Sequence, residues 1–191
     1  MKKAELVIFD MDGLMFDTGQ LSYRAYLESA KHFDFTVNHS VYYYLTGRTD
    51  SDIREKMREL YGEDAPISEW RDKINLIRKR ILSEEKRVFK KKGLLELLEF
   101  LKNNNYKIAL ASSSSREKIE YYFKIEDMPD IFDIIVAGDE VNAGKPNPEI
   151  FLKACKKANV MPEHALVLED SMVGIKAALQ GNIRPFLIPD N

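Results

Sequence analysis

The chain has 191 residues, of which 45% are hydrophobic and 31% charged, with a formal net charge of −2. These values are typical of a globular protein with one domain and an insertion, or with two small domains, and they disfavour nucleic acid or an anionic membrane as a partner. The single cysteine, Cys155, excludes an intrachain disulfide, and no segment has the apolar length of a membrane span or a signal peptide, so we expect a cytoplasmic protein.

Short apolar runs predict five β-strands along the chain. The runs are residues 6–9, 107–111, 133–137, 165–169 and 185–188. They are nearly continuous rather than alternating, which is typical of strands buried on both faces of a parallel sheet.

The stretch that follows the first strand has a different character. It lacks convincing buried strands and is rich in amphipathic helical patterns such as "DSDIREKMRELYG". We interpret it as a helical insert with hinges near residues 17–20 and 89–93. The predicted domains are therefore an α/β core of residues 1–17 and 90–191, and a helical cap of residues 18–89.

Helical patterns alternate with the remaining strands. Ser115 and Ser171 are expected N-caps, Asn147 is an expected N-cap with Pro148 at the first helical position, and Gly181 is expected to end a helix. Cys155 falls within an amphipathic pattern and is assigned to the core. The alternation predicts a doubly wound α/β fold with a parallel sheet.

Polar side chains follow four of the predicted strands, where ligands bind in an open parallel sheet. They are Asp10 and Asp12 after the first strand, Ser112 and Ser113 after the second, Lys145 after the third, and Glu169 and Asp170 after the fourth. Each residue alone is explained as a cap, a turn or a surface charge. Together, carboxylates from two strands indicate a Mg²⁺ site, and a lysine and a hydroxyl beside them would bind phosphoryl oxygens.

At these positions the sequence resembles the haloacid dehalogenase superfamily, most closely its branch of small-capped phosphatases and β-phosphoglucomutase-like enzymes. The resemblance covers nearly the whole chain and is carried by "DMDG", "ALASS", "GKPNPEIF" and "LEDS". It implies a Rossmannoid doubly wound parallel sheet with a small helical cap inserted after the first strand.

The resemblance also implies the chemistry of the first two acidic residues. Asp10 would be the nucleophile that becomes an aspartyl phosphate. Asp12 would protonate the leaving oxygen and then activate the acceptor, so that one hard displacement is divided into two easier ones.

The same resemblance implies the remaining roles in the core. Mg²⁺ would bind Asp10, the backbone carbonyl of Asp12 and Asp170, with Glu169 in support. Ser112 and Lys145 would hold the transferring phosphoryl group, and Ser113 would contact the substrate.

In the cap, the loop "LTGRTDSD" resembles the substrate-specificity loop of the family. Gly47, Arg48 and Thr49 are predicted to reach the substrate, Arg48 as a partner for a distal anionic group, although a solvated loop charge explains Arg48 nearly as well. Ser22 occupies the position where β-phosphoglucomutases carry a histidine, which disfavours mutase activity.

Three hypotheses for function follow. The first is a Mg²⁺-dependent phosphatase, expected to be a monomer, that hydrolyses a small phosphorylated metabolite such as a sugar phosphate. The alternative is a phosphohexomutase of the β-phosphoglucomutase kind. The third is a protein that binds a phosphorylated metabolite without turning it over.

Overall fold

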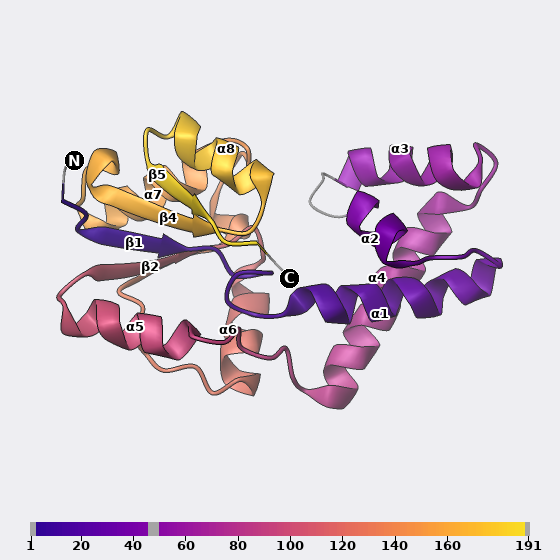
Figure 1. Ribbon diagram of the computed structural model, residues 1–191, viewed down its shortest axis with the longest axis horizontal. Helices are drawn as coiled ribbons and strands as arrows, with labels where there is room; N and C mark the ends of the chain where they lie inside the picture. The colour runs from indigo at the N-terminus through magenta and orange to yellow at the C-terminus, as the bar shows by residue number, and fades with distance from the viewer. Residues whose placement is uncertain (1–2, 46–49, 190–191) are drawn as a thin grey trace. The chain divides into compact units, whose positions relative to one another are not determined.

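The computed structural model describes residues 3–45 and 50–189, and the chain divides into two compact units (Figure 1). The first unit joins Met1–Asp17 to Val88–Asn191, and the second is Thr18–Arg87. These boundaries lie close to those expected at residues 17 and 89, and the assignment of the units as separate domains stays a prediction. The predicted substrate contacts Gly47, Arg48 and Thr49 lie outside the described residues.

The first unit is built on a parallel sheet in the strand order β3-β2-β1-β4-β5. The strands are β1 (Leu6–Phe9), β2 (Lys107–Ala111), β3 (Ile134–Val136), β4 (Ala165–Glu169) and β5 (Arg184–Leu187). All of β1 is buried, as expected of a continuous apolar run at the centre of a parallel sheet. The predicted doubly wound α/β fold is confirmed.

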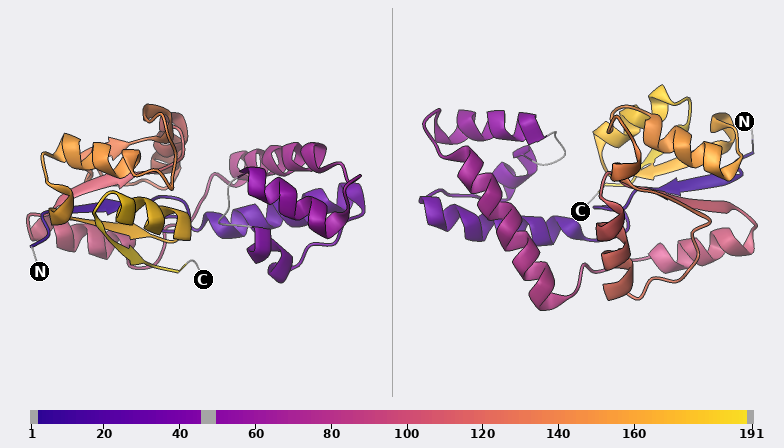
Figure 2. Two further views of the ribbon diagram at one scale, coloured as in Figure 1. Left: turned by 90° about the horizontal axis from the view of Figure 1, so that it is seen from above. Right: turned by 180° about the vertical axis from the view of Figure 1, so that it is seen from behind.

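Helices lie on both faces of this sheet. The longer ones are α5 (Leu94–Asn103), α6 (Arg116–Ile125), α7 (Glu149–Ala158) and α8 (Met172–Gln180), and the 3-10 turns are η2 (Gly138–Glu140) and η3 (Pro162–His164). Helices α7 and α8 cover one face and α5 lies on the other (Figures 1 and 2). Apolar residues of α7, including Phe151 and Cys155, pack with Leu6 and Ile8 of β1, so Cys155 belongs to the core as expected.

The ends of these helices follow the expected capping chemistry, with one correction. The side chain of Ser115 accepts a hydrogen bond from the N–H of Lys118, and that of Ser171 accepts one from Gly174. The N-cap expected at Asn147 is wrong, because α7 begins one residue later and Pro148 is its N-cap. Asn147 still contributes, since its Oδ1 accepts a bond of 2.9 Å from the N–H of Glu149.

The second unit is helical and has its own core. Its elements are α1 (Thr18–Ala30), η1 (Lys31–Phe33), α2 (His39–Leu45), α3 (Asp50–Tyr61) and α4 (Ile67–Glu85). The fully buried Trp70 of α4 donates a hydrogen bond of 2.9 Å from Nε1 to Oγ of Ser29 on α1. Tyr26 packs in the same cluster and its hydroxyl accepts a bond of 2.7 Å from Arg71, so these buried side chains provide hydrogen-bond partners for one another.

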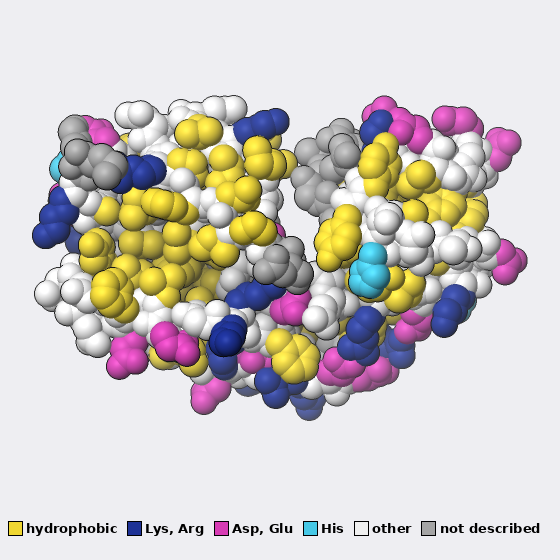
Figure 3. All heavy atoms as spheres, in the orientation of Figure 1, with side chains coloured by type: hydrophobic (Ala, Val, Ile, Leu, Met, Phe, Trp, Pro, Cys, Tyr) yellow, Lys and Arg dark blue, Asp and Glu magenta, His cyan; other side chains and the backbone are white. Residues whose placement is uncertain are grey.

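Hydrophobic side chains gather on the visible face of the first unit (Figure 3). Strand β5 lies at the edge of the sheet, and Phe186, Leu187 and the following Ile188 are all substantially exposed. Among the described residues, no helix combines the length and the hydrophobicity that crossing a bilayer requires.

Candidate active site

Three neighbouring strands carry their polar residues to one edge of the sheet. Strand β1 lies between β2 and β4, and the residues that end or follow these strands are Asp10, Ser112 and Glu169. The N–H of Asp10 donates to the carbonyl of Leu168 at 3.0 Å, which continues the β1–β4 pairing up to the site. All three side chains are buried. The structure therefore places them at the edge where open α/β sheets bind ligands.

Lys145 joins this edge from the loop before α7. Its Nζ donates to Asp10 Oδ1 and to Glu169 Oε1, each at 2.6 Å, and lies 3.4 Å from the carbonyl oxygen of Ala111. The side chain of Lys145 is 6% exposed, and those of Asp10 and Glu169 are 9% and 1% exposed. The ammonium also lies 4.8 Å from the ring centre of Phe151. Lys145, Asp10 and Glu169 form the buried lysine cluster.

The charges in the buried lysine cluster shift one another's pKa values. Burial, together with the charge of the neighbouring Glu169, raises the pKa of Asp10 to about 6, although Lys145 acts in the opposite direction. Burial alone would lower the pKa of Lys145, but the charges of Asp10 and Glu169 outweigh it and raise that pKa. Asp10 and Lys145 are therefore both mostly charged at neutral pH, and the ion pair between them is intact there.

The start of α8 donates hydrogen bonds to the carboxylate of Glu169. Its Oε2 accepts bonds from the N–H of Ser171 at 2.9 Å and from the hydroxyl of Ser171 at 2.8 Å. A Cβ atom on Gly174 would lie only 1.8 Å from Glu169 Oε1, so the carboxylate occupies the space that a glycine leaves open. The helix start therefore fixes the direction in which Glu169 points.

A second acidic residue of the same loop completes a group that fits a divalent cation. Carboxylate oxygens of Asp10, Glu169 and Asp170 lie within 4.8 Å of one another. Their three negative charges exceed the single positive charge of Lys145, and carboxylate oxygens are the donors that Mg²⁺ prefers. Gly13 has a φ of +89°, and a Cβ there would lie 2.1 Å from Asp170 Oδ2, so the loop after β1 approaches Asp170 closely only because residue 13 has no side chain.

The carboxylate of Asp12 lies in a different group. Its Oδ2 accepts a hydrogen bond of 2.7 Å from the hydroxyl of Ser114, and Nζ of Lys118 lies 3.0 Å from each of its two oxygens. Lys118 also donates to Ser114 Oγ at 2.9 Å. Asp12, Ser114 and Lys118 form the Asp12 clamp. Neither Ser114 nor Lys118 was predicted as a site residue. The only sequence signal for them is that they follow the second strand and stand four residues apart from each other.

The two predicted serines after β2 differ in their surroundings. Ser112 is 1% exposed, its N–H donates to the carbonyl of Val136 at 3.1 Å, and its Oγ accepts a bond of 3.1 Å from the N–H of Ser114. Ser113 is exposed, and its backbone packs so closely on Gly138 that a Cβ there would lie 2.2 Å from the Ser113 carbonyl oxygen. The structure therefore brings Ser112 to the sheet edge, while Ser113 stays a predicted substrate contact.

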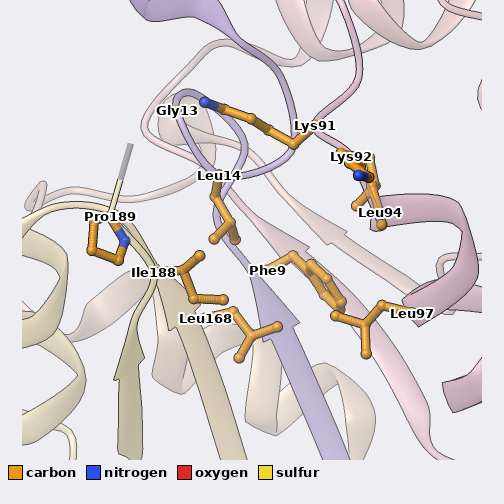
Figure 4. Close-up of a pocket in the computed structure, with 11 residues that line it drawn as sticks. Phe9, Gly13, Leu14, Lys91, Lys92, Leu94, Leu97, Leu168, Ile188 and Pro189 are labelled. Atoms are coloured by element: carbon orange, nitrogen blue, oxygen red, sulfur yellow. The ribbon is translucent and has the colours of Figure 1, made fainter. Parts of the chain in front are cut away.

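A separate pocket of about 380 Å³ lies beside this edge (Figure 4). Its lining is mostly apolar, and Figure 4 shows Phe9, Leu14, Leu97 and Leu168 around a common space. None of the predicted site residues within 3–45 and 50–189 lines it. The charged groups described above therefore do not open into this pocket.

The residues at this edge of the sheet indicate the kind of chemistry that the protein performs. A parallel sheet with its acidic residues, a buried lysine and a serine at the carboxyl edge is arranged for chemistry on an anionic substrate. A family model described as "Haloacid dehalogenase-like hydrolase" matches residues 7–188. The chain belongs to the haloacid dehalogenase-like hydrolase family and is a hydrolase.

Individual relatives agree with this membership. The chain is 35% identical over 185 residues to a phosphorylated carbohydrates phosphatase of Thermotoga maritima, a match that covers 94% of this chain and 82% of the relative. The crystal structure of CbbY from Rhodobacter sphaeroides with xylulose-(1,5)bisphosphate matches with a TM-score of 0.73 and 26% identity, covering 97% of this chain and 86% of that one. A β-phosphoglucomutase from Clostridium difficile matches with a TM-score of 0.70 and 26% identity, covering 95% and 83%.

Proposed function

We propose that the chain is a Mg²⁺-dependent phosphatase that hydrolyses a small phosphorylated carbohydrate through an aspartyl phosphate on Asp10. The observation that carries the proposal is that the carboxylates of Asp10 and Asp12 lie in two separate groups of side chains. Asp10 lies buried against Lys145 and beside Glu169 and Asp170, whereas the carboxylate of Asp12 is held separately by the Asp12 clamp. This separation supports a role for Asp10 as the nucleophile and for Asp12 as the proton carrier. The names of the relatives support a phosphorylated carbohydrate as the substrate class.

In the first step an ionised oxygen of Asp10 attacks phosphorus. The bond from phosphorus to the leaving oxygen breaks, and Asp12 gives its proton to that oxygen. Because the pKa of Asp10 is about 6, most of the nucleophile is ionised at neutral pH. In the second step water attacks the aspartyl phosphate, Asp12 takes a proton from this water, and the bond to Asp10 breaks to release inorganic phosphate.

The neighbouring residues prepare these steps. Lys145 orients the Asp10 carboxylate and, with Ser112, would hold phosphoryl oxygens as charge builds on them. Asp10, Asp170 and the backbone carbonyl of Asp12, with Glu169 in support, would hold Mg²⁺. A bound Mg²⁺ supplies positive charge that reduces the repulsion between the anionic nucleophile and the phosphate. Gly47, Arg48, Thr49 and Ser113 are the proposed substrate contacts.

The central test is Asp10→Asn, which keeps the shape of the side chain but removes its negative charge. We expect phosphate release from a panel of sugar phosphates in Mg²⁺ to fall by about 10³-fold or more, because the covalent route is lost. Chelation of Mg²⁺ should abolish the wild-type activity. The exposed Asp130→Asn is the matched control and should retain full activity. Unchanged phosphate release from Asp10→Asn, or a wild-type protein that hydrolyses none of the esters, would overturn the proposal.

A phosphohexomutase is the second candidate, and it is favoured by the likeness to a solved β-phosphoglucomutase. Against it stands Ser22 on α1, at the position where the resemblance leads one to expect a histidine. The two activities share the first step and differ in the acceptor, which is water in one and a sugar hydroxyl in the other. Product analysis of the same sugar phosphates separates them, since a mutase yields an isomeric sugar phosphate and a phosphatase yields the free sugar.

A further inference from the structure

Lys118 lies on the first turn of α6 with its ammonium group directed at three oxygen atoms. A lysine has three N–H donors, and here they face Asp12 Oδ1 and Oδ2, each at 3.0 Å, and Ser114 Oγ at 2.9 Å. Ser114 in turn donates to Asp12 Oδ2 at 2.7 Å. The three residues thus form a closed ring of hydrogen bonds that leaves the lysine no unused donor.

The local structure holds Lys118 in this direction. Its backbone N–H donates to Oγ of Ser115, the N-cap of α6. Its ammonium lies 5.0 Å from the ring centre of Tyr122, which stands four residues later on the same side of the helix and is buried. Arg116 fixes the start of the helix by donating to the carbonyl of Ile135 at 2.9 Å and by pairing with Glu140. The lysine is therefore presented to Asp12 by an ordered helix start.

We propose that Lys118 is a positioning residue for Asp12, an inference that rests on the proposed function. A carboxyl group that delivers a proton must point at the leaving oxygen, and misplacing a reacting group by about 1 Å is costly for catalysis. A carboxylate has about four lone-pair sites. The clamp makes three contacts with it, so a site remains for the proton while rotation of the group is restricted.

Two simpler roles compete with this one. A half-exposed ion pair is often of little consequence, and the side chains of Lys118 and Asp12 are 38% and 33% exposed. Alternatively, the ammonium binds an anionic group of the substrate. The first role predicts no kinetic effect of removing the charge, and the second predicts weaker substrate binding whatever the leaving group.

The experiment compares phenyl phosphate with p-nitrophenyl phosphate in the full chain with Mg²⁺. The two esters have similar shapes, but phenol is a far poorer leaving group than p-nitrophenol and needs the proton from Asp12 much more. For Lys118→Met we expect kcat/KM to fall about 10- to 100-fold on phenyl phosphate and less than about 3-fold on p-nitrophenyl phosphate. Lys118→Arg should recover most of the loss, because a guanidinium group can also donate to both carboxylate oxygens.

Lys124→Met, an exposed lysine on the same helix, is the matched control and should behave as wild type on both esters. An equal loss on both esters, no loss on either, or a failure of Lys118→Arg to recover activity would overturn the role of Lys118 and leave the proposed phosphatase standing. A wild-type protein that hydrolyses neither these two esters nor any sugar phosphate of the panel would overturn the proposed function itself.

Discussion

The buried lysine cluster and the Asp12 clamp use the same chemical pair, an ammonium and a carboxylate, in different surroundings. The side chain of Lys145 is 6% exposed and bonds to two buried carboxylates, whereas that of Lys118 is 38% exposed and bonds to one carboxylate that is 33% exposed. Water can replace the ammonium only in the second case. A buried charge that loses its partner is strongly destabilising, while an exposed one is solvated at little cost.

Because the two ion pairs differ in exposure, we expect them to contribute to different properties of the protein, namely stability in one case and side-chain geometry in the other. Lys145 neutralises carboxylates that could not otherwise stay ionised together inside the protein, so its loss affects both folding and chemistry. Lys118 contributes little to stability but decides where the Asp12 carboxylate points. Variants of the two clusters should therefore differ in kind as well as in size.

The largest effect is expected from Lys145→Met. Without the ammonium, Asp10 and Glu169 are left as neighbouring buried carboxylates, and the loss of a buried partner typically costs about 3–5 kcal/mol of unfolding free energy. Phosphate release should fall by about 10³-fold. Urea unfolding at pH 7 without divalent cations measures the first effect, and a phosphate assay measures the second.

Lys118→Met is the matched comparison for stability, and it should change the unfolding free energy by less than about 1 kcal/mol. Equal destabilisation by the two methionine variants would contradict the division between the clusters. If added Mg²⁺ restores part of the stability of Lys145→Met, the acidic group of Asp10, Glu169 and Asp170 binds the ion as proposed.

A smaller effect is expected from Gly174→Ala, which alters only the buried lysine cluster. Alanine normally favours a helix by about 1 kcal/mol over glycine. Here its Cβ would lie 1.8 Å from Glu169 Oε1, so we expect a net loss of about 1–3 kcal/mol and reduced activity as Glu169 is displaced from Lys145. Thermal unfolding measures the loss of stability, and the phosphate assay measures the loss of activity.

Gly144→Ala provides the control for this substitution, because a Cβ there would meet no atom within 4 Å. It should leave stability nearly unchanged. A stabilised Gly174→Ala protein would mean that Glu169 moves aside freely, and the rigid support of the cluster by α8 would then be wrong.

The two clusters also differ in how far the sequence predicts them. Continuous apolar runs predict the strands, and the order of the strands in the structure places Asp10, Ser112 and Glu169 at one edge, where all three side chains are buried. The burial of Lys145 between two carboxylates was not predicted, because the sequence does not show how the loop before α7 folds back over the sheet. Its expected role was only that of a phosphate ligand.

The Asp12 clamp was missed for a different physical reason. Lys118 lies 106 residues after Asp12, and a lysine on the first turn of a helix is usually a solvated charge. Ser114 and Lys118 stand four residues apart, but that spacing alone predicts only that the two residues are neighbours if helical geometry extends to both. The contact with Asp12 depends on how α6 is oriented, and hydrophobic periodicity does not determine that orientation.

The smallest effect on activity is expected from a change at Glu140. This residue pairs with Arg116 at the start of α6 and so supports the Asp12 clamp indirectly. Burial alone would raise the pKa of Glu140, but hydrogen bonds from Lys157, from the N–H of Ala137 and from Arg116 outweigh burial and lower this pKa to about 2 from 4.5. Because the folded state binds the proton less tightly than the unfolded state, this stabilisation is fully present above pH 4.5 and is lost as the pH falls through about 2.

Glu140→Gln should therefore lower the unfolding free energy by about 1–2 kcal/mol at pH 7, a value reduced from the full pKa difference because the side chain is 25% exposed. The gap in unfolding free energy between Glu140→Gln and wild type should narrow as the pH is lowered from about 4.5. Urea unfolding across this pH range measures the gap. Glu120→Gln, an exposed site on α6, is the control and should show no gap. Since Glu140 pairs with Arg116 at the start of α6, Glu140→Gln should also weaken activity slightly on phenyl phosphate and not on p-nitrophenyl phosphate. A gap that stays constant with pH would show that Glu140 acts through packing rather than through its charge.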